Sequence, residues 1–349
     1  MAFRPETGAN PVPRVKTTER SSDWRSGLAR TVYLFGANDM PQLKANGLEI
    51  AIERFGDASS EPILLIRGLG SQLVHWPGEF VAGFVEKGFY IVAYDNRDAG
   101  LSQKIGETGA ADIAGIGSKS VSGASPNAHY TLLDMAADGV GVLDALGLSC
   151  AHVLGISMGG MILQEMAIHF PERVKSATIV MSSSGAPELP SAQPEVLERP
   201  TSAPPASDRE SVVTHWLRCD QAWASPAYPF DKASRRELYC AAYDRCYCPD
   251  GTARQYAAIL AATDRFERLS EIRSPTLVIH GTQDTIFSIE HGRDIAARIP
   301  GSELLEVEGM GHDLEGPVPA LIVQNVTRLA RRAQRAQIPT DTPPARGTE

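Results

Sequence analysis

The sequence predicts an α/β protein, built as a mostly parallel, doubly wound sheet with an inserted helical cap. Apolar strand patterns alternate with helix patterns over residues 46–184 and again over 267–336, as expected where helices cover both faces of a parallel sheet. The segment between them, 185–266, opens with prolines and then gathers aromatic residues, which is typical of an insertion. We predict that residues 1–45 form a partly disordered N-terminal arm. Residues 337–349 are predicted to form a disordered, Pro- and Thr-rich tail.

The elements of the core follow from short apolar runs and from apolar residues at helical spacing. The predicted strands cover 62–66, 90–94, 151–154, 175–181, 275–280 and 303–307. The predicted helices cover 77–86, 132–146, 158–170 and 317–335. A helix over 132–146 is favoured because its apolar positions recur at helical spacing and Gly147 follows as a stop.

One serine stands at a junction between two such patterns. Gly155, Ser157 and Gly159 form the motif G-x-S-x-G between the strand at 151–154 and the helix at 158–170. A sharp strand-to-helix turn would strain Ser157 and expose its hydroxyl at the sheet edge. The alternative is a glycine-rich helix start with a surface serine. A serine hydroxyl is a weak nucleophile alone, so the prediction requires a base and an acid that orients it.

Downstream residues supply both groups in the order that this turn predicts, an acid and then a histidine. Asp284 follows the strand at 275–280, and His312 follows the strand at 303–307 in a glycine-flanked loop. Both therefore lie beyond strand ends, where open α/β sheets bind their ligands. Glu308 is the rival acid, but it is too close to His312 in sequence, and we expect it to face solvent.

The other histidines of the eight have weaker claims. We expect His152, His169 and His280 to be structural, and His75 to line the pocket because it is near a glycine-rich loop. His129, His215 and His291 have no supporting context.

These motifs carry a family resemblance. From about residue 45 to 334 the chain resembles the α/β-hydrolase superfamily, and within it capped esterases of the aclacinomycin methylesterase-like and enol-lactonase-like groups. The carrying segments are 67–70, 95–102, the turn at Ser157 and the loops of Asp284 and His312. The resemblance implies that Ser157 is the nucleophile, His312 the general base and then acid, and Asp284 the residue that orients His312. The chemistry of a serine–histidine–acid group leads to the same roles.

Two backbone N–H groups are expected to form the oxyanion hole. One belongs to Met158, directly after the nucleophile at the positive end of a helix. The resemblance implies that Leu69 donates the other. The family's usual His-Gly is replaced by Arg67-Gly68. We expect Arg67 to be structural, for instance paired with a nearby carboxylate, and the alternative is that it reaches the substrate.

The segment 95–102 carries charged residues that could suggest acid–base chemistry. The resemblance implies instead that Arg97 and its neighbours brace the loop through ion pairs and hydrogen bonds.

The insertion at 185–266 is the predicted lid. It carries Trp216, Trp223, Tyr228, Phe230, Tyr239, Tyr243, Tyr247 and Tyr256. Some of these rings must form the small core of the lid itself. We also expect Trp216 and Trp223, with His75, to contact an apolar or aromatic part of a substrate.

The resulting functional prediction is a cofactor-free serine hydrolase, acting on a small-molecule carboxylic ester or lactone through an acyl-enzyme. Peptidase, C–C hydrolase and acyltransferase activities remain open, because those branches of the family also use serine. A ligand-binding receptor of the same fold is the alternative from another class.

Composition limits the partners and the location. The net charge is −9 and the calculated pI about 5.5, which disfavours nucleic acids and anionic membranes. No apolar run approaches the roughly 20 residues of a membrane span. Residues 1–30 lack a signal-peptide pattern, so we expect a cytoplasmic protein. Cys240, Cys246 and Cys248 match no trusted zinc spacing, and with Cys150 and Cys219 we expect them to be thiols. No metal is expected, and a homo-oligomer remains open.

Overall fold

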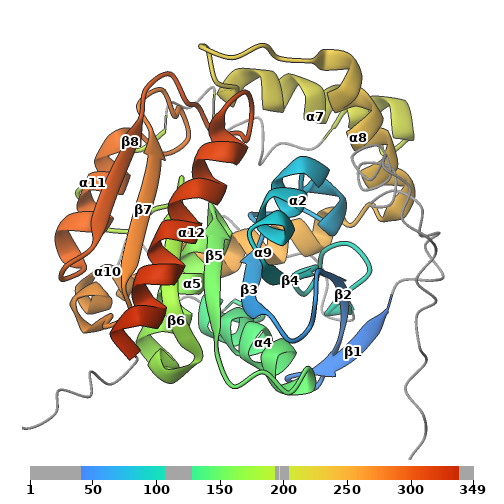
Figure 1. The fold of residues 1–349 in the computed structure, drawn as a ribbon. Helices are drawn as coiled ribbons and strands as arrows, with labels where there is room; N and C mark the ends of the chain where they lie inside the picture. Colours follow the sequence, from blue (N-terminus) through green and yellow to red (C-terminus); the bar gives the residue numbers. More distant parts are fainter. Residues whose placement is uncertain (1–40, 107–127, 193–195, 197–203, 338–349) are drawn as a thin grey trace, which may run out of the picture.

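A computed structural model describes residues 41–106, 128–192, 196 and 204–337. The disorder predicted for the arm before residue 41 and for the tail after 337 lies outside these residues. Within them, an 8-stranded sheet has the order β1-β2-β4-β3-β5-β6-β7-β8 (Figure 1). The pairs β1–β2 and β2–β4 are antiparallel and the others are parallel. The strands are β1 Gln42–Ala45, β2 Leu48–Phe55, β3 Glu61–Ile66, β4 Phe89–Tyr94, β5 Ala151–Ile156, β6 Val174–Val180, β7 Thr276–Gly281 and β8 Glu303–Val307.

The central strands are buried because helices cover both faces of the sheet. Every residue of β4, β5 and β7 is buried, as expected for the continuous apolar runs of a parallel sheet. Helices α2 and α12 pack on one face, and α4, α5 and α11 pack on the other (Figure 1). The core helices are η1 Leu73–His75, α2 Gly78–Glu86, α4 Leu132–Ala145, α5 Met158–His169, η3 Pro171–Arg173, α10 Arg265–Arg268, η4 Leu269–Glu271, α11 Ile289–Arg298 and α12 Val318–Gln337.

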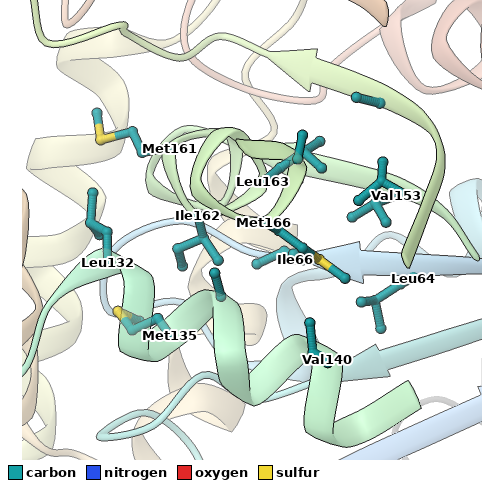
Figure 2. Close-up of a cluster of buried hydrophobic side chains, with 14 of the residues drawn as sticks. Leu64, Ile66, Leu132, Met135, Val140, Val153, Met161, Ile162, Leu163 and Met166 are labelled. Atoms are coloured by element: carbon teal, nitrogen blue, oxygen red, sulfur yellow. The ribbon is translucent and has the colours of Figure 1, made fainter. Parts of the chain in front are cut away.

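Helix α4 shows how local sequence positions a core element. Its N-terminus carries a capping box, in which the Thr131 hydroxyl accepts from the N–H of Asp134 and the Asp134 carboxylate accepts from the N–H of Thr131. This box satisfies two backbone donors that the first turn would leave free. Leu132, Met135 and Val140 then face α5 and β3 in one cluster (Figure 2). The helix predicted over 132–146 is confirmed to within one residue.

The sheet begins earlier than the sequence predicted. Strand β1 lies inside the segment assigned to the arm, and its hairpin with β2 turns at Asn46 and Gly47, whose φ angles are 49° and 80°. Positive φ at both central residues defines the turn that best matches the twist of paired strands. β1 was missed because it is a short edge strand with exposed polar residues and no apolar run.

The insertion between β6 and β7 is helical. We call α7 Arg209–Trp223, α8 Lys232–Arg245 and α9 Pro249–Ala261 the inserted helices. Helices α7 and α8 pack together beyond one end of the sheet (Figure 1). Helix α9 is bound to the core by the buried ion pair of Arg254 with Asp98, at 2.8 Å. Among the described residues, every helix is too short or too polar to cross a lipid bilayer.

Candidate active site

Ser157 occupies a strained turn between β5 and α5. Its φ is 56° and its ψ is −120°, a conformation that costs a non-glycine residue about 1–3 kcal/mol and is found mainly at functional sites. The flanking glycines make the turn possible. A Cβ on Gly155 would lie 2.1 Å from the carbonyl oxygen of Gly159, and one on Gly159 would lie 2.2 Å from that of Ile66. The backbones of β3, β5 and α5 therefore approach one another more closely than any side chain allows.

The structure brings together the three residues that the sequence predicted as a group. Nε2 of His312 lies 3.0 Å from Oγ of Ser157, and Nδ1 of His312 lies 2.7 Å from Oδ2 of Asp284. Asp284 follows β7 and His312 follows β8, so the loops after neighbouring parallel strands meet at one edge of the sheet. The distances are within the range of hydrogen bonds for both contacts.

Asp284 is buried but remains suited to carry a charge. Burial alone would raise its pKa. The neighbouring His312 and the backbone N–H of Phe287 outweigh burial, so the pKa of Asp284 lies below its usual value of 3.8. Its second oxygen, Oδ1, accepts from the N–H groups of Ile286 and Phe287, each at 2.9 Å. Both carboxylate oxygens are thus held in place.

The two predicted oxyanion donors lie beside the serine. A Cβ on Gly68 would be 3.1 Å from Cβ of Ser157, so the loop that carries Leu69 runs against the nucleophile. Met158 is the first residue of α5, where backbone N–H groups have no partner within the helix. In the described part of the chain, the N–H groups of Leu69 and Met158 have no protein acceptor.

The segment 95–102 is a brace, as predicted. Arg97 makes two hydrogen bonds to the buried carboxylate of Asp138, at 2.6 and 2.7 Å. Asp95 accepts from the backbone N–H of Leu73 at 2.7 Å, and Asn96 donates to the carbonyl of Arg67 at 3.0 Å. The bonds of Asp95 and Asn96 hold the segment that follows β3, and those of Arg97 fix 95–102 to helix α4.

The loop of His312 is anchored by residues that the sequence did not single out. The N–H of His312 donates to the carbonyl of Trp223 at 2.8 Å. The next residue, Asp313, accepts from the N–H of Ser225 at 2.8 Å and from its hydroxyl at 2.5 Å. The sequence offered a signal for Asp313, because this residue directly follows His312. It offered no signal for Ser225, which lies 88 residues from Asp313 in the chain.

The three predicted pocket residues occupy different places. The ring of Trp216 packs on Tyr239 and Tyr247, with centroids 5.7 and 5.9 Å away, so it belongs to the aromatic core of the inserted helices. Trp223 donates from its indole N–H to Asp220 at 3.0 Å. His75 lies 6.1 Å from Tyr239, so it connects the loop after β3 to the inserted helices.

Other titratable residues have structural partners. His152 bonds Ser176 at 2.8 Å, and His280 bonds the carbonyl of Phe287 at 2.7 Å. His291, for which the sequence offered no context, is buried between Ser183 at 2.9 Å and the carbonyl of Pro190 at 3.0 Å. Glu308 is exposed, as expected.

The cysteines of the described residues are free thiols, and no three His, Cys, Asp or Glu side chains in that part of the chain gather as metal ligands would. Cys150, which precedes β5, is partly exposed.

Arg67 does not form the ion pair with a carboxylate that the sequence suggested. No carboxylate among the described residues lies within ion-pair distance of it, and its guanidinium carbon sits 4.7 Å from the ring centre of Trp76. Its Nε and Nη1 atoms are buried and have no hydrogen-bond partner.

The sheet order, the strained serine turn and the loops after β7 and β8 define a class of fold, that of the α/β hydrolases. A family model described as the alpha/beta hydrolase fold matches residues 61–203 and 249–314. The chain belongs to this family.

Relatives and solved structures agree with this assignment. Rhodomycin D methylesterase of Streptomyces peucetius is 29% identical over 283 residues, covering 75% of this chain and 88% of that protein. 3-Oxoadipate enol-lactonase 2 of Acinetobacter baylyi is 26% identical over 270 residues, covering 76% of this chain and 87% of that protein. The crystal structure of the enol-lactonase from Burkholderia xenovorans LB400 has a TM-score of 0.60 at 22% identity, covering 83% of this chain and 100% of that one.

Proposed function

We propose that this protein is a serine hydrolase that cleaves carboxylic esters or lactones through an acyl-enzyme on Ser157. The observation that carries the proposal is the continuous hydrogen-bonded series from Ser157 to His312 to Asp284, built on a strained turn. Its relatives include a methylesterase and an enol-lactonase, which supports ester and lactone bonds as the substrates. We treat residues 185–266 as the cap over this site.

The first half of the reaction would form the acyl-enzyme. Nε2 of His312 accepts the proton of the Ser157 hydroxyl as Oγ bonds to the substrate carbonyl carbon. Asp284 keeps Nδ1 of His312 protonated, which leaves Nε2 free to act as the base. The negative charge that develops on the carbonyl oxygen is stabilised by the N–H groups of Leu69 and Met158. His312 then gives the proton to the departing alkoxide as the carbon–oxygen bond breaks.

The second half would release the acid. A water molecule gives a proton to Nε2 of His312 as its oxygen bonds to the acyl carbon. The tetrahedral intermediate then collapses as the bond between the acyl carbon and Oγ breaks, and His312 returns the proton to Oγ of Ser157. A lactone follows the same route, except that its alcohol remains attached to the acid product.

The inserted helices supply the proposed apolar contact with the substrate. A series of ring contacts leads from His75 at the core loop to Tyr239 and then Trp216. We propose that apolar or aromatic substrates bind against this series. Trp216→Ala should then lower kcat/KM more for bulky aromatic esters than for short aliphatic ones, and an equal loss on both would contradict this contact.

Turnover of a panel of p-nitrophenyl acyl esters and lactones tests the proposed activity. The wild-type protein should hydrolyse members of the panel, and Ser157→Ala should lose this activity by a factor of about 10³ or more. A stoichiometric acyl adduct, detected by intact mass and absent in Ser157→Ala, identifies the nucleophile. A protein that binds these compounds but turns over none of them would instead be a receptor of this fold.

A further inference from the structure

The loop that carries His312 has little regular structure of its own. Residues 308–316 follow β8 without forming a helix or a strand, and three of them are glycines. The bonds to Asp284 and Ser157 fix the imidazole of His312, but they do not fix the backbone that carries it. A general base must stay within hydrogen-bond reach of the proton that it takes. The backbone at His312 therefore needs support from another part of the molecule.

The insertion supplies this support, where helix α7 ends at Trp223. Three consecutive residues of the loop bond to it. The N–H of Gly311 donates to Oγ of Ser225, and the N–H of His312 donates to the carbonyl of Trp223, each at 2.8 Å. The carboxylate of Asp313 accepts from the N–H of Ser225 at 2.8 Å and from its hydroxyl at 2.5 Å. The Ser225 hydroxyl thus accepts from the residue before His312 and donates to the residue after it.

These bonds lie in a close and buried contact. A Cβ on Gly311 would lie 2.6 Å from the carbonyl oxygen of Trp223 and 2.8 Å from the backbone nitrogen of Ser225, so no side chain fits between the two segments. Ser225 and Asp313 are 3% and 6% exposed. Water competes little for hydrogen bonds at this burial, and a lost partner leaves a polar group unsatisfied. The loop of His312 is therefore held at a fixed distance from the insertion.

The end of α7 also reaches the loop of Asp284. The hydroxyl of Thr285, the residue after Asp284, donates to the carbonyl of Ala222 at 3.3 Å. Ala222 directly precedes Trp223, whose carbonyl accepts from His312. The last turn of one inserted helix thus spans the loops that carry the proposed base and its orienting acid.

We propose that Ser225 and Asp313 are positioning residues for His312, so that the insertion holds the catalytic machinery in place. This inference rests on the proposed function. Neither side chain needs to touch the substrate. Their bonds set the backbone of His312, and through it the distance from Nε2 to Oγ of Ser157. Both halves of the proposed reaction use His312 for proton transfer, so loss of these bonds should lower kcat and leave KM nearly unchanged.

Ser225→Ala and Asp313→Asn test this role with the best p-nitrophenyl ester of the panel. Ser225→Ala removes both bonds of the hydroxyl. Its kcat per folded molecule should fall by roughly 10- to 100-fold, as expected for a displaced catalytic group, with KM within about twofold of the wild-type value. Asp313→Asn keeps the size of the side chain and one acceptor oxygen, so its kcat should fall by a smaller factor of roughly 3 to 10. If Ser225→Ala does not fold, Asp313→Asn carries the comparison.

Tyr228→Phe is the matched control. Tyr228 follows Ser225 in the same part of the insertion, and its hydroxyl donates to the carbonyl of Glu308 in the loop of His312, at 3.1 Å. The variant removes a bond between the same two segments but none at residues 311–313, so kcat should stay within about twofold of the wild-type value. A loss as large as that of Ser225→Ala would mean that general loosening of the contact lowers kcat, and the inference would be overturned.

The rate at which a fluorophosphonate labels Ser157 separates failure of this inference from failure of the proposed function. Labelling needs His312 to activate Ser157 but needs no ester turnover, and intact mass follows it. Ser225→Ala should label roughly 10- to 100-fold more slowly than the wild type, and Tyr228→Phe should label at the wild-type rate. If no ester is turned over but this difference remains, the proposed ester hydrolysis is wrong and the positioning role stands.

The opposite outcome overturns the inference alone. Esters would then be turned over, while the folded Ser225→Ala and Asp313→Asn variants keep both kcat and the labelling rate within about twofold of the wild-type values. Ser225 and Asp313 would in that case only stabilise the fold. If Ser157 is neither labelled nor active on any ester, the proposed function and the positioning role are both wrong.

Discussion

Asp284 and His312 form the shorter of the two hydrogen bonds that link Ser157, His312 and Asp284, with 2.7 Å between Oδ2 and Nδ1. The other carboxylate oxygen accepts two backbone N–H groups, so the side chain cannot rotate away from the imidazole. Nε2 of His280 lies 3.7 Å from the same Oδ2 atom. The bond from His280 to the carbonyl of Phe287 holds this imidazole in place beside the carboxylate of Asp284.

Asp284→Asn should abolish most of the activity without unfolding the protein. An amide in this position favours the wrong tautomer of His312, so Nε2 would carry the proton and could not act as a base. We expect kcat to fall by about 10³- to 10⁴-fold. Ester turnover and a thermal unfolding curve measure the two effects. Retention of more than about a tenth of kcat would show that Asp284 does not orient His312.

Ser157→Gly should be more stable than Ser157→Ala. Both remove the hydroxyl, but alanine keeps a Cβ at a φ of 56°, whereas glycine adopts this conformation without strain. Part of the gain is lost because glycine has more freedom in the unfolded chain, so we expect a net difference of about 1 kcal/mol in the free energy of unfolding. Chemical denaturation of both variants measures it. Equal stabilities would mean that the turn at Ser157 relaxes in solution.

Arg254→Met should loosen helix α9 from the core. Asp98 is buried and is bonded to Nε and Nη2 of Arg254, each at 2.8 Å. Removing one partner leaves the other charge buried, which typically costs about 3–5 kcal/mol. The double variant with Asp98→Asn should recover part of this loss, since no buried carboxylate remains and asparagine tolerates the φ of 68° at that position. A double variant less stable than Arg254→Met would contradict this explanation.

Glu53→Gln should remove a pH dependence of stability. Burial raises the pKa of Glu53 from 4.5 to about 7, with Arg245 opposing the shift and Asp95 adding to it. The native state therefore holds this proton more tightly than the unfolded chain, and the free energy of unfolding should fall as the pH rises from about 4.5 to about 7. The contribution is at most about 3 kcal/mol. Denaturation at pH 5 and pH 8 should show a smaller fall for the variant than for the wild type.

The sequence by itself determined the parallel core and the chemistry at its edge. Apolar runs and helical periodicity indicated β3 to β8 and the helices α2, α4, α5 and α12, because both patterns act over a few neighbouring residues. The serine turn could be predicted for the same reason, since Gly155, Ser157 and Gly159 are adjacent. Asp284 and His312 each follow a strand of the predicted parallel sheet. Because parallel strands end at one edge of the sheet, this order predicts that both residues lie near Ser157.

Only the tertiary structure decided which contacts support the site and which charges around it are paired. The pair of Asp98 and Arg254 joins residues 156 positions apart, and no local pattern specifies such a contact. The same holds for Arg67. Its position beside Gly68 can be read from the sequence. Whether its charge is paired depends on its neighbours in space, and Asp220 and Glu315 come from segments far along the chain. The fold brings both carboxylates to Arg235 and leaves Arg67 against Trp76.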